Sequence, residues 1–331
     1  MQSFNWGIIG PGNIAHDFVT DLKRIKTPRQ QVQAVLSHRK QSATEFAKAF
    51  GVPHAFTSID KFIEHKKDID AVYIATPHTL HFEQALACLK NGIPVLCEKP
   101  VTINARQLRT LITASARYRC FLMEGMWVRL LPSIKRVSEL IKEKVIGDII
   151  SISANMSYKA PYDPMGRYFN PDLGGGSLLD LGIYPLFLAV MILGKPPVIK
   201  AVGRISPKGI DESCAVLLQY KNGQYAMLES SLVAKTDLSA TIYGQKGIIT
   251  IPAPWNEKPT HIKLTFYNGT KIEYPCKWQG HGFQYEAEEV VHCVMNKKTE
   301  SQLLNHRLSM DIMETMDEIR KQIHVRYKKF E

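Results

Sequence analysis

The sequence predicts two domains of different class: a doubly wound, parallel α/β domain, then an α+β domain with an open, mostly antiparallel sheet. Three observations lead to this prediction. Short β-branched runs alternate with helical stretches up to about residue 122, strand follows strand from 197 to 275, and the last part returns to helix. A chain of 331 residues is also long enough for two domains. We place the domains at residues 1–122 and 123–331.

Five apolar runs of the first domain have the length of strands: Asn5–Ile9, Val32–Ser37, Ala71–Thr76, Pro94–Glu98 and Cys120–Glu124. Amphipathic stretches near 14–25, 41–50, 58–66, 80–91 and 104–117 separate them or precede them as helices. Strands joined by helices of this length form right-handed βαβ units, so we expect a parallel sheet. The run AVYIAT is as apolar as a buried parallel strand requires.

The pattern changes in the second domain. A helical stretch near 133–145 precedes IGDIISISANMSY, which alternates as a strand with one buried face does. Between 197 and 275, the turn signals KGID, KNGQ and YNGT separate further strands. Residues 284–322 return to a helical pattern.

Composition favours a cytoplasmic globular protein. Hydrophobic residues make up 45% and charged residues 22% of the chain, and no uninterrupted apolar run approaches the ~18 residues of a membrane span. The start, MQSFNWGIIGPG, lacks the features of a signal peptide. The net charge of +11 is scattered and has no nucleic-acid-binding motif beside it, so we expect no nucleic acid and no membrane partner.

Histidine and cysteine spacing predicts no metal site. The six cysteines contain no CxxC pair, which favours reduced thiols over a disulfide framework or a zinc site. His54, His65, His78 and His81 do not combine with Cys or Asp at ligand spacing.

A phosphate-binding fingerprint follows the first strand. Residues 10–15 read GPGNIA, a GxGxxA pattern at the head of a helix. Glycine permits the tight turn and the close approach of backbone to a pyrophosphate, and the helix N-terminus holds the phosphates. We therefore predict dinucleotide binding by Gly10, Gly12, Asn13 and Ile14. The alternative is a glycine-rich turn between packed elements.

The end of the second strand predicts the kind of dinucleotide. An NAD-selective site places Asp or Glu there to bind the ribose hydroxyls, but this chain has Ser37, His38, Arg39 and Lys40. Ser37 and Arg39 are suited to a 2′-phosphate, so we predict NADP(H) rather than NAD(H), with Ser37, His38 and Arg39 as cofactor-binding residues. Alternatively, the basic residues are only the solvated first turn of the next helix.

Polar residues also follow the next two long strands, at the edge where ligands bind in an open parallel sheet. Thr76, Pro77, His78 and His81 follow one of them, and Glu98-Lys99-Pro100 ends the other. We predict that all of these residues except Pro100 contact the cofactor, with His81 also lining the substrate site. For His78 a helix cap, and for Lys99 an ordinary surface position, remain open.

The stretch GGGSLLDLGIYP, residues 174–185, places an acid and a phenol in an apolar helical run. Asp180 and Tyr184 are four residues apart and share one face of a helix. The three glycines either let backbone approach a ligand closely, which we prefer, or form a flexible lead-in to the helix.

These motifs together resemble the Gfo/Idh/MocA oxidoreductase family: GIIGPGNIA, ATPHTLHFEQA, CEKP and GGGSLLDLGIYP occur in the family's order along nearly the whole chain. MEGMWVR, residues 123–129, and RYF, residues 167–169, are most similar to the dimeric dihydrodiol dehydrogenase and NADP-dependent D-xylose dehydrogenase branch. Many relatives have DxGxH where this chain has DLGIY. Tyrosine in place of histidine fits the dihydrodiol dehydrogenase branch and not the sugar substrates typical of the histidine members.

The resemblance implies an N-terminal Rossmann domain, NADP(H) between the domains and a homodimer formed through the C-terminal sheet. It also implies that Lys99 and Tyr184 are catalytic, with Asp180 beside them, and that the bond before Pro100 resembles a cis peptide of relatives.

A phenol with a pKa of about 10 is a poor base at neutral pH, and a neighbouring ammonium lowers that pKa. Our hypothesis makes Tyr184 the acid/base, with Lys99 lowering its pKa and bonding the substrate hydroxyl. Asp180 would orient Lys99 or bind a second hydroxyl. The alternatives are a core tyrosine and an aspartate bonded to backbone.

Further residues are assigned to the substrate side: His81, Trp127, Arg129, Arg167 and Tyr184. Trp127 could equally be packing, and Arg167 with Tyr168 and Phe169 could form a lid. We predict an NADP-dependent oxidoreductase for a trans-dihydrodiol, aldose or related polyol. The alternative is a non-catalytic NADP- or sugar-sensing regulatory protein on the same fold, although Lys99, Asp180 and Tyr184 are all retained.

Overall fold

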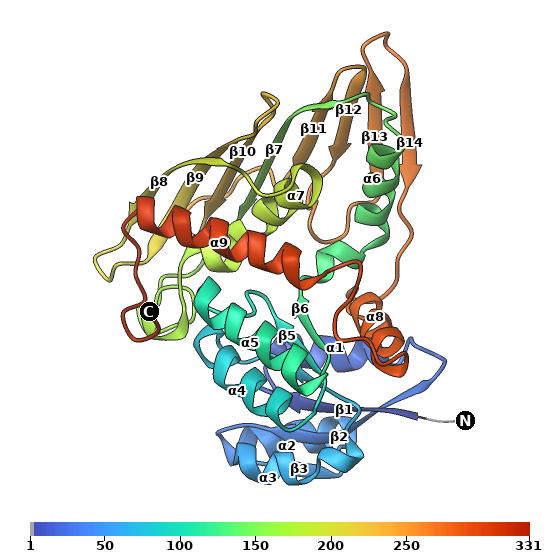
Figure 1. The fold of residues 1–331 in the computed structure, drawn as a ribbon, viewed down its shortest axis with the longest axis vertical. Helices are drawn as coiled ribbons and strands as arrows, with labels where there is room; N and C mark the ends of the chain where they lie inside the picture. The colour runs from blue at the N-terminus through green and yellow to red at the C-terminus, as the bar shows by residue number, and fades with distance from the viewer. Residues whose placement is uncertain (1–2) are drawn as a thin grey trace. The chain divides into compact units, whose positions relative to one another are not determined.

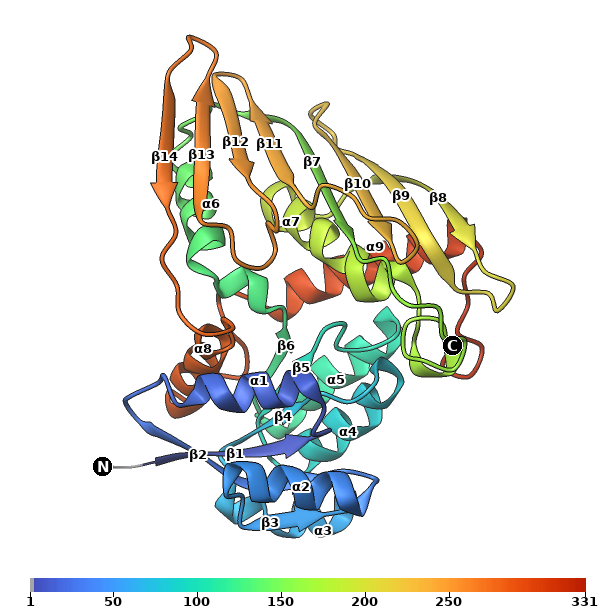
Figure 2. The same ribbon diagram turned by 180° about the vertical axis from the view of Figure 1, so that it is seen from behind.

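The computed structural model describes residues 3–331, which form two compact units (Figure 1, Figure 2). The first unit contains the chain up to Trp127 together with Gln279–His306, and the second contains Val128–Trp278 and Arg307–Glu331. The sequence-based division at residues 122 and 123 did not anticipate that a late segment returns to the first unit.

The first unit contains a six-stranded parallel sheet in the order β3-β2-β1-β4-β5-β6. Its strands are β1 (Ser3–Ile9), β2 (Arg29–Leu36), β3 (His54–Phe56), β4 (Ala71–Ile74), β5 (Val95–Glu98) and β6 (Leu122–Gly125). The order reverses beside β1, as in a doubly wound fold. All four residues of β4 are buried, which agrees with their continuous apolar run.

Six α-helices accompany this sheet: α1 (Asn13–Leu22), α2 (Lys40–Phe50), α3 (Ile59–Glu64), α4 (His78–Lys90), α5 (Ala105–Tyr118) and α8 (Gln284–Met295). Helix α8 belongs to the returning segment and packs against α1 (Figure 1, Figure 2). The core beneath these helices includes the fully buried side chains of Trp6, Phe18 and Ile74.

The second unit contains an eight-stranded sheet in the order β14-β13-β12-β11-β7-β10-β9-β8, antiparallel except between β7 and β10. Its strands are β7 (Ile149–Ser157), β8 (Val198–Ile205), β9 (Asp211–Gln219), β10 (Tyr225–Ser231), β11 (Ala240–Gly244), β12 (Gly247–Ile251), β13 (His261–Phe266) and β14 (Lys271–Pro275). The predicted fold class is therefore confirmed: a doubly wound parallel sheet and a mostly antiparallel one.

Helices cover one face of the second sheet (Figure 1, Figure 2). These are α6 (Pro132–Lys142), α7 (Ile183–Leu193) and α9 (His306–Gln322). The segment Pro171–Leu193 is long and apolar enough to cross a membrane, but 83% of its most apolar window is buried inside the protein. Its hydrophobicity therefore suits the core helix of this unit.

Candidate active site

The fingerprint loop joins β1 to α1 and has the backbone geometry that its glycines predict. Gly10 has φ +89°, and a Cβ atom there would lie 2.7 Å from Thr76 Cγ2 and 2.9 Å from the carbonyl of Ala75. The Gly10 N–H donates a 2.9 Å hydrogen bond to the Leu36 carbonyl. The first glycine is thus required by the turn itself.

Gly12 is constrained differently. It precedes α1 with an extended backbone, φ −84° and ψ −176°, and within residues 3–331 no atom beyond its chain neighbours lies within 4 Å of the position of an added Cβ. The next residues, Asn13 and Ile14, open the helix, whose first amides have no intrahelical acceptor, while the small Ala15 is fully buried. Open space before free amides fits the pyrophosphate of a dinucleotide.

The end of β2 carries no acidic residue. Ser37 is buried, and its Oγ accepts a 3.3 Å hydrogen bond from the Arg39 N–H. The side chains of His38, Arg39 and Lys40 are exposed where α2 begins. Cationic and hydroxyl groups therefore stand where an NAD-selective site has a carboxylate.

His81 cross-links two turns of the first unit. The side chain is fully buried, with Nδ1 2.8 Å from the Pro100 carbonyl oxygen and Nε2 2.8 Å from the Thr76 carbonyl oxygen. Burial lowers the pKa of the imidazole despite these two acceptors. His81 therefore fixes the end of β4 against the turn after β5, a structural role that its predicted cofactor and substrate contacts did not include.

The other predicted residues at this edge take separate positions. Thr76 Oγ1 donates to Gln84 Oε1 at 2.7 Å, whereas Pro77 and His78 begin α4. Lys99 follows β5, and its bond to Pro100 is cis, as the resemblance implied.

Glu98 is held from two sides. Its Oε1 accepts a 2.5 Å hydrogen bond from the Tyr73 hydroxyl, and its Oε2 accepts a 3.2 Å bond from the Lys99 N–H. Glu286 of α8 is fully buried, and neither of its oxygens has a hydrogen-bond partner within residues 3–331. Burial and the charge of Glu98 raise the pKa of the Glu286 carboxyl well above its usual range.

Tyr73 and Glu286 were not identified from the sequence. Tyr73 lies inside an apolar strand, where a tyrosine is usual, and Glu286 is one of several acids on α8. Only Glu286's spacing from the buried Val290 and Cys293, at i, i+4 and i+7, could have indicated that it points inward.

In the second unit, the predicted helix with Asp180 and Tyr184 begins as a π-helical turn, Leu178–Gly182, and continues as α7. Both side chains are buried, with 5% of Asp180 and 7% of Tyr184 exposed. Single π-helical turns within helices occur frequently at functional sites. Periodicity predicted the helix but not its widened first turn.

The glycines before this turn allow close approach to protein atoms, not the ligand contact that we preferred from the sequence. A Cβ on Gly175 would lie 2.7 Å from the Tyr168 carbonyl oxygen. Gly176 has φ +132°, and its Cβ would lie 2.5 Å from Asp211 Oδ1 and 2.9 Å from the Tyr327 hydroxyl. These contacts fix where the helix starts.

Arg167 joins Asp180 and Tyr184 in one cluster. Its Nη2 donates a 2.6 Å hydrogen bond to Asp180 Oδ1, and its guanidinium lies over the Tyr168 ring, 4.7 Å from the centroid. Burial acts to lower the pKa of Arg167, but the charge of Asp180, its hydrogen bond and the nearby phenols of Tyr168 and Tyr184 outweigh burial, so the pKa is raised. The structure thus brings together three of the predicted site residues and gives the carboxylate a cation from its own unit.

The other residues assigned to the substrate side or to a lid are described by their own surroundings. The Trp127 ring stacks on Phe283 within the first unit, with centroids 5.4 Å apart, which agrees with the packing alternative. Arg129 lies in a short 3-10 helix, Trp127–Leu130, and is partly buried. Phe169 is buried and contacts the Tyr162 ring, with centroids 5.1 Å apart.

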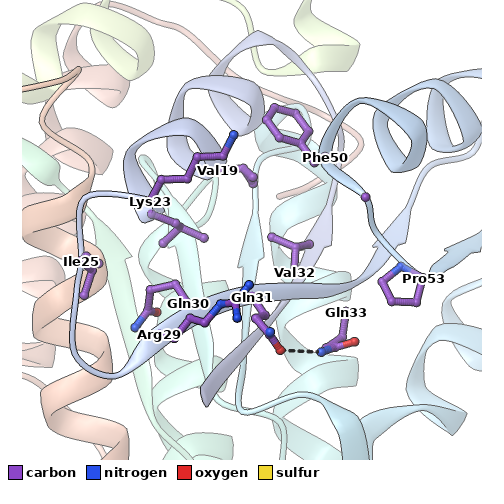
Figure 3. Close-up of a pocket in the computed structure, with 12 residues that line it drawn as sticks. Val19, Lys23, Ile25, Arg29, Gln30, Gln31, Val32, Gln33, Phe50 and Pro53 are labelled. Carbon is purple, nitrogen blue, oxygen red and sulfur yellow. Dashed lines mark hydrogen bonds between the residues drawn. The ribbon is translucent and has the colours of Figure 1, made fainter. Parts of the chain in front are cut away.

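Figure 3 shows a cavity of about 500 Å³ in the first unit that is separate from the fingerprint loop. It is lined by the C-terminal end of α1 with the following Lys23, and by the first five residues of β2, from Arg29 to Gln33. The fingerprint lies at the opposite ends of these two elements. Within residues 3–331, no group of three or more His, Cys, Asp or Glu side chains could hold a metal ion.

Known proteins match both units. Residues 4–126 match the Gfo/Idh/MocA model described as an oxidoreductase family with an NAD-binding Rossmann fold, and residues 134–250 match the C-terminal domain of the same family. The chain is 34% identical to the trans-1,2-dihydrobenzene-1,2-diol dehydrogenase of Xenopus laevis, covering 97% of this chain and 98% of the relative. It is 30% identical to the Homo sapiens protein of the same name, over 98% of each chain.

Solved structures share the fold. The aldose-aldose oxidoreductase of Caulobacter crescentus aligns with a TM-score of 0.88 at 20% identity, covering 98% of each chain. A 3-ketoreductase from Actinomadura kijaniata, solved with NADP and TDP-benzene, aligns with a TM-score of 0.85 at 24% identity, covering 97% of this chain and 98% of that one. With both of its domains matched and its dinucleotide fingerprint in place, the chain belongs to the Gfo/Idh/MocA family of oxidoreductases.

Proposed function

We propose that this dehydrogenase acts on the CH–OH group of a trans-dihydrodiol, aldose or related polyol with NADP(H), using Tyr184 as the acid/base and Lys99 as its assistant. Full-length relatives named dihydrodiol dehydrogenases support a diol or sugar as the substrate. The observation that carries the proposal is the ion pair between the half-exposed Arg167 and the buried Asp180, four residues before the buried Tyr184, in a chain whose first unit has a dinucleotide fingerprint.

The cofactor, when bound, supplies the hydride acceptor and donor. Tyr184 then has to take the hydroxyl proton during oxidation and return it during reduction. A nearby cation favours the phenolate form, and Arg167 supplies such a charge from within the second unit. Lys99, at the carboxyl end of β5, is the second cation that we assign to this task.

The direct test offers NADP⁺ and NAD⁺ separately with a panel of trans-dihydrodiols, aldoses and polyols, and follows cofactor reduction by absorbance. Turnover on any member supports the enzyme and identifies its substrate class. Tight dinucleotide binding without turnover across the whole panel would favour the sensing alternative.

We expect Arg39→Ala to weaken NADP⁺ binding by about ten- to hundredfold, because one charge-assisted hydrogen bond to a phosphate is worth roughly 1.5–3 kcal/mol. Binding of NAD⁺ should change little, since it lacks the 2′-phosphate. Titration calorimetry with both dinucleotides measures the two effects. The matched control is Lys48→Ala in the last turn of the same helix. Equal losses for both dinucleotides would contradict an NADP-selective Arg39.

A homodimer is proposed through the face of the second sheet that lies away from its helices. Apolar side chains are exposed on three neighbouring strands there: Val202 is 71%, Leu217 45% and Met227 47% exposed. Leu217 pairs in register with Met227, and a hollow of about 670 Å³ lies over these strands. Contiguous exposed apolar area of this kind marks an interaction surface.

We expect Leu217→Glu to shift the protein from dimer to monomer in sedimentation velocity at micromolar concentration, because a charge would be buried in an apolar interface. Tyr118→Glu, at an exposed site in the first unit, is the control. A wild-type monomer, or an unchanged dimer of the variant, would contradict this surface.

A further inference from the structure

A buried carboxylate far along the chain holds the start of the proposed catalytic helix. Asp211 is the first residue of β9 and is fully buried. Its Oδ2 accepts a 2.7 Å hydrogen bond from Ser177 Oγ and a 2.6 Å bond from the Leu178 N–H. Ser177 and Leu178 lie three and two residues before Asp180, so a side chain from the sheet caps the π-helical turn.

Other residues hold the same point. Ser177 Oγ also lies 3.0 Å from Ser230 Oγ, and because Ser177 donates to Asp211, Ser230 is the donor in this second bond. The Tyr327 hydroxyl donates a 2.6 Å hydrogen bond to the Gly175 carbonyl. Strands β9 and β10 and the C-terminal segment therefore converge on residues 175–178.

An ionisable side chain at this buried position is not explained by the stability of the fold alone. Asp211 Oδ1 has no hydrogen-bond partner within residues 3–331, and a buried unpaired oxygen is unfavourable for folding. Burial raises the pKa of Asp211 to about 6, although the bonds from Ser177 and Leu178 and the charge of Arg320 act to lower it.

One cation and two neutral groups surround Asp211, and the charge of Arg320 favours its carboxylate form. Arg320 of α9 is buried, bonds Asp317 and Glu331, and lies over the Tyr327 ring, 5.3 Å from the centroid. On its own strand, burial and then the charge of Asp211 raise the pKa of the Cys214 thiol, which keeps that group neutral. Burial and then the charge of Asp211 likewise raise the pKa of Tyr327, so its hydroxyl remains a donor.

We propose that Asp211 is a positioning residue for the active site: its carboxylate fixes the first turn of the helix and thereby the directions of Asp180 and Tyr184. The proposal rests on the function assigned above to Tyr184. Displacements of about 1 Å can reduce turnover by about a hundredfold, so a shift of this turn would act on kcat even though Asp211 contacts no reacting group.

The test is Asp211→Asn, which keeps the size and one acceptor of the side chain but removes its charge. Because the folded-state pKa of Asp211 is raised to about 6, the wild-type carboxylate protonates as the pH falls through that value and its hydrogen bonds weaken. We therefore expect wild-type kcat to decrease as the pH falls below about 6, which forms the acid limb of its pH profile. In the variant we expect kcat to be reduced about tenfold at neutral pH, without that acid limb and with an unchanged dinucleotide Kd.

Ser177→Ala provides a second variant should Asp211→Asn fail to fold. It removes one hydrogen bond to the carboxylate and should lower kcat several-fold while retaining the acid limb. Asp148→Asn, at an exposed acid of the same unit, is the control. Amide hydrogen exchange of residues 174–184 gives a readout without turnover, and faster exchange is expected in both test variants.

If Asp211→Asn had the same kcat as the wild type and the same amide hydrogen exchange at residues 174–184, the positioning role would be overturned. So would an acid limb that persists unchanged in that variant. Failure of the proposed function can be distinguished from failure of the positioning role. In that case the wild-type protein would turn over no substrate, yet Asp211→Asn would still speed amide exchange at residues 174–184.

Discussion

Replacing Tyr184 with phenylalanine should reduce kcat by at least about a hundredfold, because general acid–base catalysis contributes roughly 10²- to 10⁴-fold. The variant loses only the hydroxyl, and the ring keeps its buried place in α7, so the free energy of unfolding should change little. Dinucleotide affinity should also be unchanged, because the fingerprint loop is in the other unit. Steady-state kinetics and direct cofactor titration measure the two quantities separately.

Tyr220 offers a matched control for this variant. It is buried in the same unit, and its hydroxyl has no hydrogen-bond partner within residues 3–331. Tyr220→Phe should therefore retain turnover and be at least as stable as the wild type. Unchanged kcat in Tyr184→Phe would rule out the phenol as the acid/base.

The two fingerprint glycines should respond differently to alanine. Gly12→Ala should leave the free energy of unfolding nearly unchanged, since the backbone is extended and, in the described part of the chain, only the neighbouring residues come within 4 Å of the added Cβ. The same methyl would occupy the space assigned to the pyrophosphate, and overpacking of about 1–3 kcal/mol raises the dinucleotide Kd by roughly five- to 150-fold.

Gly10→Ala is the contrasting variant. Its φ of +89° and the 2.7–2.9 Å contacts of the added Cβ should destabilise the fold itself, by about 1–3 kcal/mol for the backbone strain alone. Chemical unfolding and cofactor titration of both variants separate the two roles. Wild-type affinity in Gly12→Ala would show that the loop does not hold the phosphates.

The fold was predictable because its determinants are local. Apolar runs marked the strands of the first sheet, and the pattern change after residue 122 marked the second fold class. The edge strand β3 was missed because it has only three residues and is largely exposed. The return of α8 was missed because its inward residues contact elements more than a hundred positions away, and helical periodicity does not reveal which core a face joins.

The residues of the candidate site also differ in whether local sequence could predict them. Motif residues such as Gly10, Gly12 and Lys99 could be predicted as site residues because a short pattern specifies their chemistry. Asp211 and Glu286 were missed because their roles depend on burial and on distant partners, which no window of sequence contains. The Arg167–Asp180 ion pair lies between the two cases, since both residues were named but their pairing was not.

Helix α8 is translated long after the rest of the first unit, and this order affects how the first unit folds during synthesis. The residues that α8 and its flanking loop contact are translated early; they include Phe18, Asp21, Tyr73 and Glu98. Asp21 Oδ2 accepts hydrogen bonds from the amides of residues 281–283, and Phe283 packs against Phe18. At about 5–20 residues per second, a ribosome needs roughly 10–40 s between residues 127 and 306. During that interval the nascent first unit exposes the surface that α8 will cover, so we expect chaperones to bind this surface until residues 279–306 have been translated.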